Sequence, residues 1–306
     1  MSRNATSAPS QLPERSFRTQ QTLASTARCQ GLGFISGSHV SIELRPAPVG
    51  AGISFQRLDL SGTAPVPATR EHVLDRQRRT AIGSGNVVIE LIEHTMAALA
   101  GLDVDNCLVT LDGPEPPGFD GSCQPLVESI LEAGIVAQDA PRRCLVVDRP
   151  LRVGTPEAGI VLRPIAQPGL AITYQLDYGP GSPIPPQART VSVSPKLFAE
   201  QISGCRTFVL ESEVAALKSL GYGQGLTHQD LLVFGANGPI DNPLHFDDEC
   251  ARHKILDCIG DFALLGTDLC AHVEAHGSGH ALNHLATRLL LSPAGAGSDP
   301  ALSHAA

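Results

Sequence analysis

A short polar segment near the middle of the chain separates two halves that repeat the same order of secondary structure. The segment covers residues 138–143, with the sequence QDAPRR, and apolar patterns lie on both sides of it. Each half begins with strand-like runs and continues into helical runs, an order typical of α+β proteins. Because 306 residues are enough for about two domains, we expect one α+β domain at residues 16–138 and a second of similar build at 142–292.

The two ends of the chain differ from this regular part. Residues 1–15 are rich in Ser, Pro, Asn and Arg, and residues 293–306 are mostly Gly, Ala, Pro and Ser. Neither end has regularly spaced apolar residues that could pack on a core, so both are expected to be disordered. The first residues also lack the apolar run of a secretory signal. The eight cysteines are dispersed singly without a CxxC pair, which is typical of a reducing compartment. We therefore expect a cytoplasmic protein.

Composition and charge exclude several classes of protein. The hydrophobic fraction of 42% and the charged fraction of 17% allow a sizeable core, which excludes disorder of the whole chain. The net charge of −9, with no basic run, argues against binding of nucleic acid or of an anionic membrane surface. The longest apolar stretches are far shorter than the ~18 residues of a membrane span. We therefore expect a soluble protein without a transmembrane segment.

The clearest helical period lies in the second half of the chain, in the segment DDECARHKILDCIGDFALLG. Its apolar residues recur at helical spacing, and Asp247 or Asp248 could cap its start. On this helix His253 and Asp257 are four residues apart and share a face, and Asp261 extends the same stripe. An imidazole and a carboxylate one turn apart can reach one Zn²⁺. An isolated pair of this kind is more often part of a solvated polar face.

Glu93 and His94 form a second candidate, at the point where a strand-like run turns into a helix. Neighbouring residues on a helix point in different directions, so a general base and a metal ligand could approach one centre separately. The alternative is an acid that complements the helix dipole beside a histidine of no special function.

Four histidines recur at intervals of four residues near the end of the chain: His272, His276, His280 and His284. Gly277 and Gly279 interrupt the series, which begins in a strand-like run and ends in a helical one. The four cannot share one helix face. His280, directly after the Gly-Ser-Gly turn, is the best placed to enter a cleft, although a surface histidine is the simpler interpretation.

Other site classes have little support. GLGFISG does not match the dinucleotide-binding GxGxxG, and the patterns GxxxxGK[ST], GxSxG and HExxH are absent. Spacing does not exclude a Cys/His nucleophile, but each cysteine is better explained as a buried small side chain.

Taken in order, several stretches of the chain resemble one known family, the zinc-dependent UDP-3-O-acyl-N-acetylglucosamine deacetylases of lipid A biosynthesis. Ordered matches are much more specific than any single one. The matching stretches run from about residue 18 to residue 283 and are RTQQTLASTARCQGLGFISG, LRPAPVGAGISFQRLDL, IEHTMAALAGLDVDN, DGPEPPGFDGS, CRTFVLESEVAALKSLG, FDDECARHKILDCIGDFALLG and HGSGHALN.

The resemblance implies an α+β fold of two domains, each with a helix layer on a mostly antiparallel sheet and with the active site between them. It implies a zinc ion bound by His94, His253 and Asp257, and Fe²⁺ is an alternative because these ligand types accept it too. It also implies UDP-3-O-acyl-N-acetylglucosamine as the substrate. We further expect a monomer.

The resemblance also implies a role for each remaining site residue. Glu93 would accept the proton of the attacking water, and His280, oriented by Asp261, would protonate the leaving amine. The hydroxyl of Thr207 would stabilise the oxyanion. Lys254 and Phe208 would contact the hexosamine, and Lys254 is also counted among the catalytic residues.

The chain departs from the family pattern at four positions, which are Ile35, Leu91, Val209 and Gly277. Gly277 stands where a lysine is expected, and its absence removes a positive charge suited to a nucleotide diphosphate. Two alternatives therefore stay open. The chain could be a diverged zinc deacetylase of another N-acetyl amino sugar, or a non-catalytic member that binds a nucleotide sugar.

Overall fold

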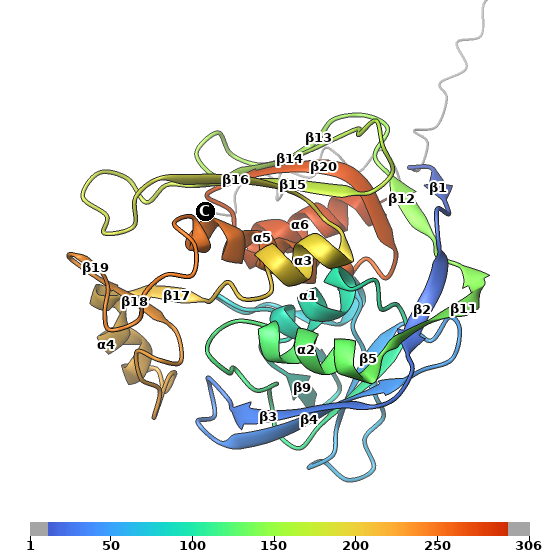
Figure 1. Cartoon of the computed structure of the whole chain (residues 1–306), viewed down its shortest axis with the longest axis horizontal. Helices are drawn as coiled ribbons and strands as arrows, with labels where there is room; N and C mark the ends of the chain where they lie inside the picture. Colours follow the sequence, from blue (N-terminus) through green and yellow to red (C-terminus); the bar gives the residue numbers. More distant parts are fainter. Residues whose placement is uncertain (1–11, 293–306) are drawn as a thin grey trace, which may run out of the picture.

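The computed structural model describes residues 12–292 of the chain. The elements stack in four layers, with a sheet at each outside and two layers of helices between them (Figure 1). The helices α1 and α2 belong to the first half of the chain, whereas α3, α5 and α6 belong to the second. The expected α+β fold, with a helix layer on a sheet in each half, is confirmed.

The sheet of the first half has five strands and is antiparallel except for the pair β10 and β5. On β4, Val40, Ile42 and Leu44 alternate with more exposed residues and are buried under the helices. In spatial order the strands are β3 (Ala27–Leu32), β4 (His39–Pro46), β10 (Cys107–Leu111), β5 (Ile53–Arg57) and β6 (Val66–Pro67), and the helices are α1 (Glu93–Gly101) and α2 (Gln124–Ala133).

A small antiparallel sheet of three strands leads from this layer into α1. It follows a 3-10 turn, η1 (Arg70–His72), and consists of β7 (Val73–Leu74), β8 (Ala81–Ser84) and β9 (Val87–Ile89). The chain passes from β9 to α1 within a few residues, so β9 fixes where that helix starts.

The second half contains a seven-stranded sheet, in which β20 runs parallel to β12 and β15 and the other pairs are antiparallel. Its strands are β1 (Glu14–Arg15), β12 (Cys144–Val146), β13 (Leu151–Gly154), β14 (Gly159–Arg163), β15 (Leu170–Leu176), β16 (Gln187–Ser192) and β20 (Asp268–His276). Its helices are α3 (Pro195–Gln201), α5 (Glu249–Ala263) and α6 (His280–Leu291). A separate three-stranded sheet with one helix comprises β17 (Phe208–Leu210), α4 (Glu211–Ser219), β18 (Leu232–Gly235) and β19 (Gly238–Pro239).

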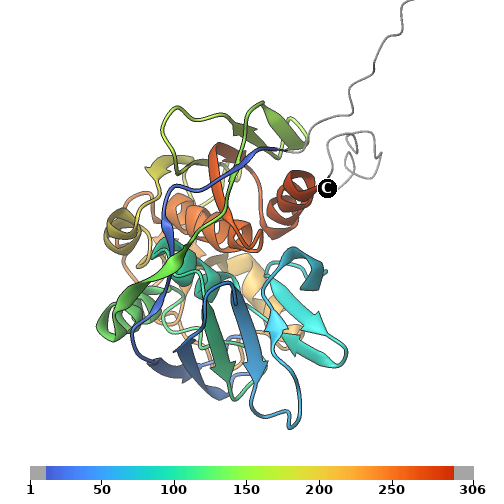
Figure 2. The same ribbon diagram turned by 90° about the vertical axis from the view of Figure 1, so that its right-hand side faces the viewer.

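Two expectations about the ends of the first half need correction. Glu14–Arg15 form β1 and pair with β12, so the disorder expected up to residue 15 does not include these two residues. Residues 138–141, expected in a linker, belong to β11 (Ile135–Pro141), which pairs with β2 (Thr19–Leu23). Figure 2 shows these two strands side by side, running between the lower and upper parts of the molecule. The disorder predicted for residues 1–11 and 293–306 lies outside the described residues.

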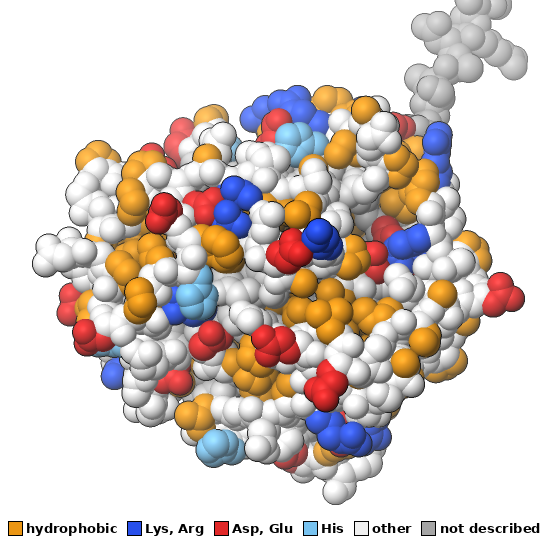
Figure 3. Space-filling view, viewed as in Figure 1, with side chains coloured by type: hydrophobic (Ala, Val, Ile, Leu, Met, Phe, Trp, Pro, Cys, Tyr) orange, Lys and Arg blue, Asp and Glu red, His pale blue; other side chains and the backbone are white. Residues whose placement is uncertain are grey.

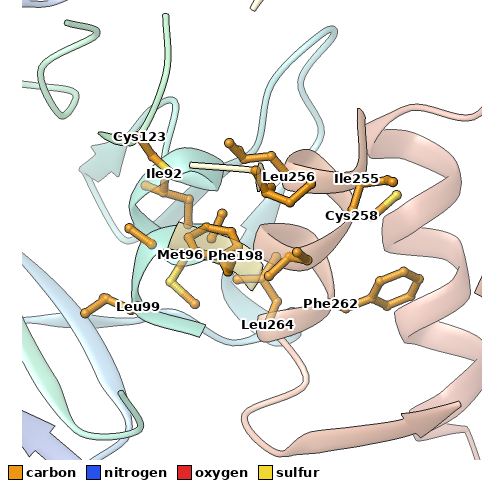
Figure 4. Close-up of a cluster of buried hydrophobic side chains, with 14 of the residues drawn as sticks. Ile92, Met96, Leu99, Cys123, Phe198, Ile255, Leu256, Cys258, Phe262 and Leu264 are labelled. Atoms are coloured by element: carbon orange, nitrogen blue, oxygen red, sulfur yellow. The ribbon is translucent and has the colours of Figure 1, made fainter. Parts of the chain in front are cut away.

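The two halves meet where α1 packs against α5. Side chains of α1, α3 and α5, among them Met96, Phe198 and Leu256, interlock in one buried cluster (Figure 4). The helix backbones approach so closely that a Cβ atom on Gly260 would lie 2.1 Å from the carbonyl oxygen of Glu93. Glycine at this position of α5 therefore sets the distance between the two halves.

The start of α5 differs in one detail from the sequence prediction. Asp248 occupies the N-cap position, but its side chain does not cap the helix and instead accepts a hydrogen bond of 2.5 Å from Arg252. The residue has φ of −107° and ψ of 28° and lacks the extended conformation that a capping aspartate usually adopts. The first turn is instead joined to the rest of the fold by Glu249, which is fully buried and paired with Arg206.

The surface carries charges of both signs. On the face shown in Figure 3, basic and acidic side chains are scattered among apolar ones without a large basic patch. None of the helices within residues 12–292 is long and apolar enough to cross a membrane.

Candidate functional site

Three predicted metal ligands come together where α1 meets α5. The Nε2 atom of His253 lies 3.5 Å from Oδ1 of Asp257, and Nε2 of His94 lies 3.8 Å from the same oxygen. One ligand atom from each of the three residues lies within 4.8 Å of the others. The first half thus supplies one donor and the second half two, so that the site lies between the two halves as expected.

The surroundings of the three side chains suit a metal that keeps an open coordination position. The Nδ1 atom of His253 lies 3.0 Å from the carbonyl oxygen of Cys205, to which it can donate, and this leaves Nε2 free as an acceptor towards the cluster. His253 and Asp257 expose only 3% and 4% of their side chains, whereas His94 exposes 19%. The cluster is therefore closed on the α5 side and accessible beside His94, as in catalytic rather than structural metal sites.

The protonation states of the three residues also fit metal binding. Burial, reinforced by His253, lowers the pKa of His94 to about 3. Burial likewise lowers the pKa of His253. Burial would raise the pKa of Asp257, but Lys254 and the neighbouring histidines outweigh it and hold the pKa well below its usual range. At neutral pH the cluster thus offers two neutral imidazoles and one carboxylate, the forms that bind a cation.

Glu93 and His280 lie next to this cluster and face each other. The distance between Glu93 Oε1 and His280 Nε2 is 3.8 Å, and His280 Nε2 lies 3.9 Å from Oδ2 of Asp257. Burial raises the pKa of Glu93 to about 7, against the opposing effect of His280. Burial lowers the pKa of His280, but Asp261 and Asp257 outweigh it and raise this pKa to about 9. A carboxylate with a pKa near neutral pH and an imidazolium with a higher pKa are suited to general base and general acid roles.

Asp261 holds His280 in place. Its Oδ2 atom accepts hydrogen bonds from Nδ1 of His280 at 2.9 Å and from the side-chain amide of Asn283 at 2.8 Å. Asp261 is fully buried, and although burial alone would raise its pKa, His280 holds the pKa well below its usual range. The ionised carboxylate fixes the ring of His280 so that Nε2 points towards the cluster.

The backbone before α1 is unusual and places Glu93. Leu91 has φ of 52°, in the left-handed region that non-glycine residues seldom adopt. The amide of Ile92 donates to the carbonyl of Thr80, and the amide of Thr80 donates at 3.0 Å to Oε2 of Glu93. Thr80, directly before β8, thus holds both the backbone and the carboxylate at the start of α1.

Of the remaining predicted residues, Lys254 and Phe208 contact members of the cluster. The Nζ atom of Lys254 donates to Oδ2 of Asp257 at 2.8 Å. Burial lowers the pKa of Lys254, but Asp257 outweighs it and raises this pKa, so that the ammonium persists. The half-buried ring of Phe208 lies edge-on to His253, with ring centres 6.1 Å apart. Thr207 is anchored by its backbone between Gly121 and Leu232.

The histidine series separates as the sequence indicates. His272 and His276 lie on β20, where they contact Thr173 and the carbonyl of Pro156, respectively. His280 and His284 lie on α6, one turn apart. His280 belongs to the site, whereas the contacts of His284 are with Asp261 and Thr80 at its edge.

Sequence analysis missed three residues that shape the site. These are Thr80, Cys205 and Asn283, whose contacts with Glu93, His253 and Asp261 are described above. Cys205 acts through its carbonyl group, which no pattern of side chains can reveal. Thr80 lies 181 residues from its partner Asp261 and has no distinctive spacing.

Comparison with known proteins agrees with this geometry. The family model described as UDP-3-O-acyl N-acetylglycosamine deacetylase matches residues 20–292. UDP-3-O-acyl-N-acetylglucosamine deacetylase of Myxococcus xanthus is 38% identical over 275 residues, which cover 89% of this chain and 86% of that protein. The enzymes of the same name from a Geobacter species and from Thermosynechococcus vestitus are each 39% identical. The match with the Geobacter enzyme covers 90% of this chain and 90% of that enzyme. The match with the Thermosynechococcus vestitus enzyme covers 89% of this chain and 92% of that enzyme. The chain therefore belongs to the UDP-3-O-acyl N-acetylglycosamine deacetylase family and is an enzyme of that family.

Proposed function

We propose that the chain hydrolyses the N-acetyl group of UDP-3-O-acyl-N-acetylglucosamine, a step of lipid A biosynthesis, and releases acetate and the free amine. One observation carries the proposal: Glu93 and His280 face each other beside a cluster of metal-ligand type, with a pKa of about 7 for Glu93 and of about 9 for His280. The names of the relatives support the choice of substrate.

Zn²⁺ is the proposed metal, held by His94, His253 and Asp257. Two imidazoles and one carboxylate make a donor set that zinc favours, although Fe²⁺ accepts the same ligands. When bound, the metal supplies a Lewis acid that polarises the amide carbonyl and lowers the pKa of water. Because Asp257 is hydrogen-bonded to Lys254 through its Oδ2, its Oδ1 remains available to the metal.

Glu93 and His280 divide the proton transfers. Glu93 is proposed to accept the proton of the water that attacks the acetamide carbonyl, since it is buried and oriented by the amide of Thr80. His280 is protonated at neutral pH and is proposed to donate its Nε2 proton to the leaving nitrogen. Asp261 keeps the Nδ1 proton of His280 in place, so that Nε2 is the atom that exchanges a proton.

Three further residues are proposed to bind the substrate. Phe208 presents a half-buried aromatic ring beside His253, suited to contact with the apolar face of a hexosamine. Lys254 is proposed as a polar contact to the sugar and as a catalytic cation next to the reacting centre. The hydroxyl of Thr207 is proposed to donate to the oxygen that becomes negatively charged.

A second substrate, another N-acetyl amino sugar, is favoured by one observation at Gly277. This residue has φ of 54°, and a Cβ atom there would lie 3.2 Å from the carbonyl oxygen of Glu157. A lysine could occupy the position only with strain, so the loop is built for glycine and lacks the charge that suits a diphosphate. Another contact would have to recognise the UDP group.

Acetate release by the purified, zinc-loaded chain tests the proposal, with UDP-3-O-acyl-N-acetylglucosamine as substrate and Glu93→Gln as the control for contaminating enzymes. We expect turnover by the wild type and a decrease of about 10²- to 10⁴-fold in kcat for the variant, with zinc content unchanged. If the wild type binds one zinc ion but releases no acetate, this substrate is wrong. Other N-acetyl amino sugars would be tested next.

We also propose that the enzyme works in the cytoplasm as a monomer. All eight cysteines are free, and seven of them are buried, as expected for a protein that never meets an oxidising compartment. Light scattering of the zinc-loaded chain tests the oligomeric state, and a mass of twice the chain would overturn that part.

A further inference from the structure

We propose that Thr80 and His284 are positioning residues, whose hydrogen-bond chain fixes Asp261 and through it the ring of His280. The inference rests on the proposed function, because it concerns the residue that donates the proton in that reaction. Neither Thr80 nor His284 is among the proposed metal ligands. Both contact Oδ1 of Asp261, and Oγ1 of Thr80 also lies 3.3 Å from Nδ1 of His280.

The chain of hydrogen bonds is continuous and largely buried. Oγ1 of Thr80 lies 2.5 Å from Oδ1 of Asp261 and 2.9 Å from Nε2 of His284. Thr80 and Asp261 are fully buried, and His284 exposes 12% of its side chain. The other oxygen of Asp261 binds Nδ1 of His280. Thr80 and His284 thus bind one side of the carboxylate, and His280 binds the other.

Counting protons assigns the donors. Asp261 is ionised and can only accept hydrogen bonds, so the single proton of the Thr80 hydroxyl goes to Oδ1, its nearest acceptor. The hydroxyl oxygen is then an acceptor for His284, which must carry its proton on Nε2. This order leaves each polar group of the chain with a partner. Losing one member would leave the next group buried and unpaired.

Thr80 also connects the two reacting groups. Its amide donates to Oε2 of Glu93, while its hydroxyl holds Asp261. Thr80 therefore orients Asp261, which supports the general acid His280. Separately, it orients the general base Glu93. A small displacement of Thr80 would change the 3.8 Å distance between Glu93 Oε1 and His280 Nε2, on which the order of proton transfers depends.

Asp261 needs this second support because Asn283 and His280 both bind its Oδ2. With Oδ1 free, the carboxylate could rotate about its Cβ–Cγ bond and carry the ring of His280 with it. The bonds from Thr80 and from His284, whose Nε2 lies 3.4 Å from Oδ1, restrict this rotation. The expected consequence is a loss of kcat rather than of substrate affinity.

Thr80→Val and Thr80→Ser form the first test, because both keep the amide that binds Glu93 and only serine keeps the hydroxyl. In zinc-loaded protein we expect Thr80→Val to lower kcat at least about tenfold, with KM changed by less than about twofold. Thr80→Ser should remain within about threefold of the wild type. Thr110→Val is the matched control, because the Thr110 hydroxyl is buried without a hydrogen-bond partner among the described residues and lies on the remote strand β10. Equal rates for the valine and serine variants at position 80 would overturn the role of the hydroxyl.

His284→Leu and His284→Gln test the outer member of the chain. Glutamine places an amide donor near the position of Nε2 and carries no charge, whereas leucine provides no donor. We expect kcat to fall several-fold in His284→Leu and to recover in His284→Gln. If both variants match the wild type, His284 has no positioning role and the chain ends at Thr80.

A measurement without substrate separates this inference from the proposed function. The Nδ1 proton of His280, bound to a buried carboxylate, should give a far-downfield signal in the proton NMR spectrum of the zinc-loaded chain. We expect the signal to shift or broaden in Thr80→Val and to persist in Thr80→Ser. If the wild type shows no turnover but the signal responds in this way, the substrate is wrong and the positioning stands. An unchanged signal in Thr80→Val would overturn the positioning whatever the substrate.

Discussion

The two helices that meet at the site contribute to it in different ways. α5 presents His253, Asp257 and Asp261 at successive intervals of four residues, so one regular helix face carries two proposed ligands and the orienting carboxylate. α1 contributes Glu93 and His94, adjacent residues in its first turn, whose positions depend on a left-handed residue at Leu91 and on the amide of Thr80. Helical periodicity places the three α5 residues on one face, whereas contacts from elsewhere place the start of α1.

The difference shows what each side needs from the rest of the fold. The three α5 residues stay on one face as long as the helix is intact, and only the carboxylate of Asp261 needs the further support of Thr80 and His284. The residues of α1 keep their positions only while Thr80 and the close contact at Gly260 hold the helix start in place. Changes that act through the backbone should therefore affect the α1 side first.

The largest effect is expected on removal of a ligand from either helix. His94→Ala and His253→Ala should each lose bound zinc, with acetate release falling to background, because a site of two remaining donors binds the ion weakly. Metal analysis after dialysis checks this. His228→Ala, which removes a half-exposed histidine elsewhere, is the control and should keep its zinc. Full zinc content in His94→Ala would mean that α1 supplies no ligand and that the metal belongs to α5 alone.

Sequence reasoning works well for α5 and poorly for the residues that support α1. The interval of four between His253, Asp257 and Asp261 can be read directly from the chain, and the structure places all three on α5. The support of Glu93 by Thr80 depends on backbone geometry and on a contact across the fold, neither of which leaves a periodic signal. The resemblance to a family suggested that Glu93 belongs to the site but gave no reason for its orientation.

The fold shows the same contrast. Strand β4 was predictable because its alternating residues Val40, Ile42 and Leu44 are buried on one face. Strand β1 has only two residues, and β11 (IVAQDAP) has no fully buried residue and no regular alternation of apolar and polar residues, so neither has a hydrophobic period. Both are strands because a partner strand is available for pairing, which the local sequence does not record.

The pH dependence of the reaction should reflect Glu93 of α1 and, separately, His280 of α6, which Asp261 of α5 orients. Burial raises the pKa of Glu93 to about 7, so its proton-accepting form is lost as the pH falls through that value. Burial lowers the pKa of His280, but Asp261 outweighs it and raises this pKa to about 9, so its protonated form is lost as the pH rises through that value. We expect a bell-shaped profile of kcat/KM with slopes of about tenfold per pH unit, and bound zinc lowers both values.

The His280→Gln variant assigns the alkaline limb of this profile. Its residual activity should keep the acid limb, due to Glu93, and lose the fall at high pH. An alkaline limb that persists in His280→Gln would have to come from another group.

A smaller effect is expected from closing the gap between the helices. In Gly260→Ala the new Cβ atom would meet the carbonyl of Glu93 at 2.1 Å, so α1 must move away from α5. Overpacking of this kind costs about 1–3 kcal/mol of unfolding free energy, partly offset by the higher helix propensity of alanine. Denaturant unfolding measures the loss, and kcat should fall because Glu93 moves.

Gly279→Ala is the control for this change, because no atom lies within 4 Å of its new Cβ and its φ of −147° is allowed for alanine. Its unfolding free energy should fall by less than about 1 kcal/mol, the preference for glycine over alanine at the N-cap of α6. Equal stability of the two variants, with kcat intact in Gly260→Ala, would show that the two helices are not in close contact.

The smallest effect, at Leu91, tests whether the left-handed residue before α1 is under strain. A bulky residue at φ of 52° costs about 1 kcal/mol, whereas asparagine tolerates this region. Leu91 is not among the partly buried residues packed against the core, so little packing is lost on substitution. We expect Leu91→Asn to raise the unfolding free energy by about 0.5 kcal/mol and Leu91→Val, with a branched Cβ, to lower it by about 1 kcal/mol. If the unfolding free energy rises in Leu91→Asn and falls in Leu91→Val, placing Glu93 requires backbone strain, which α5 does not have. Equal losses of unfolding free energy in the two variants would attribute the effect to the leucine side chain.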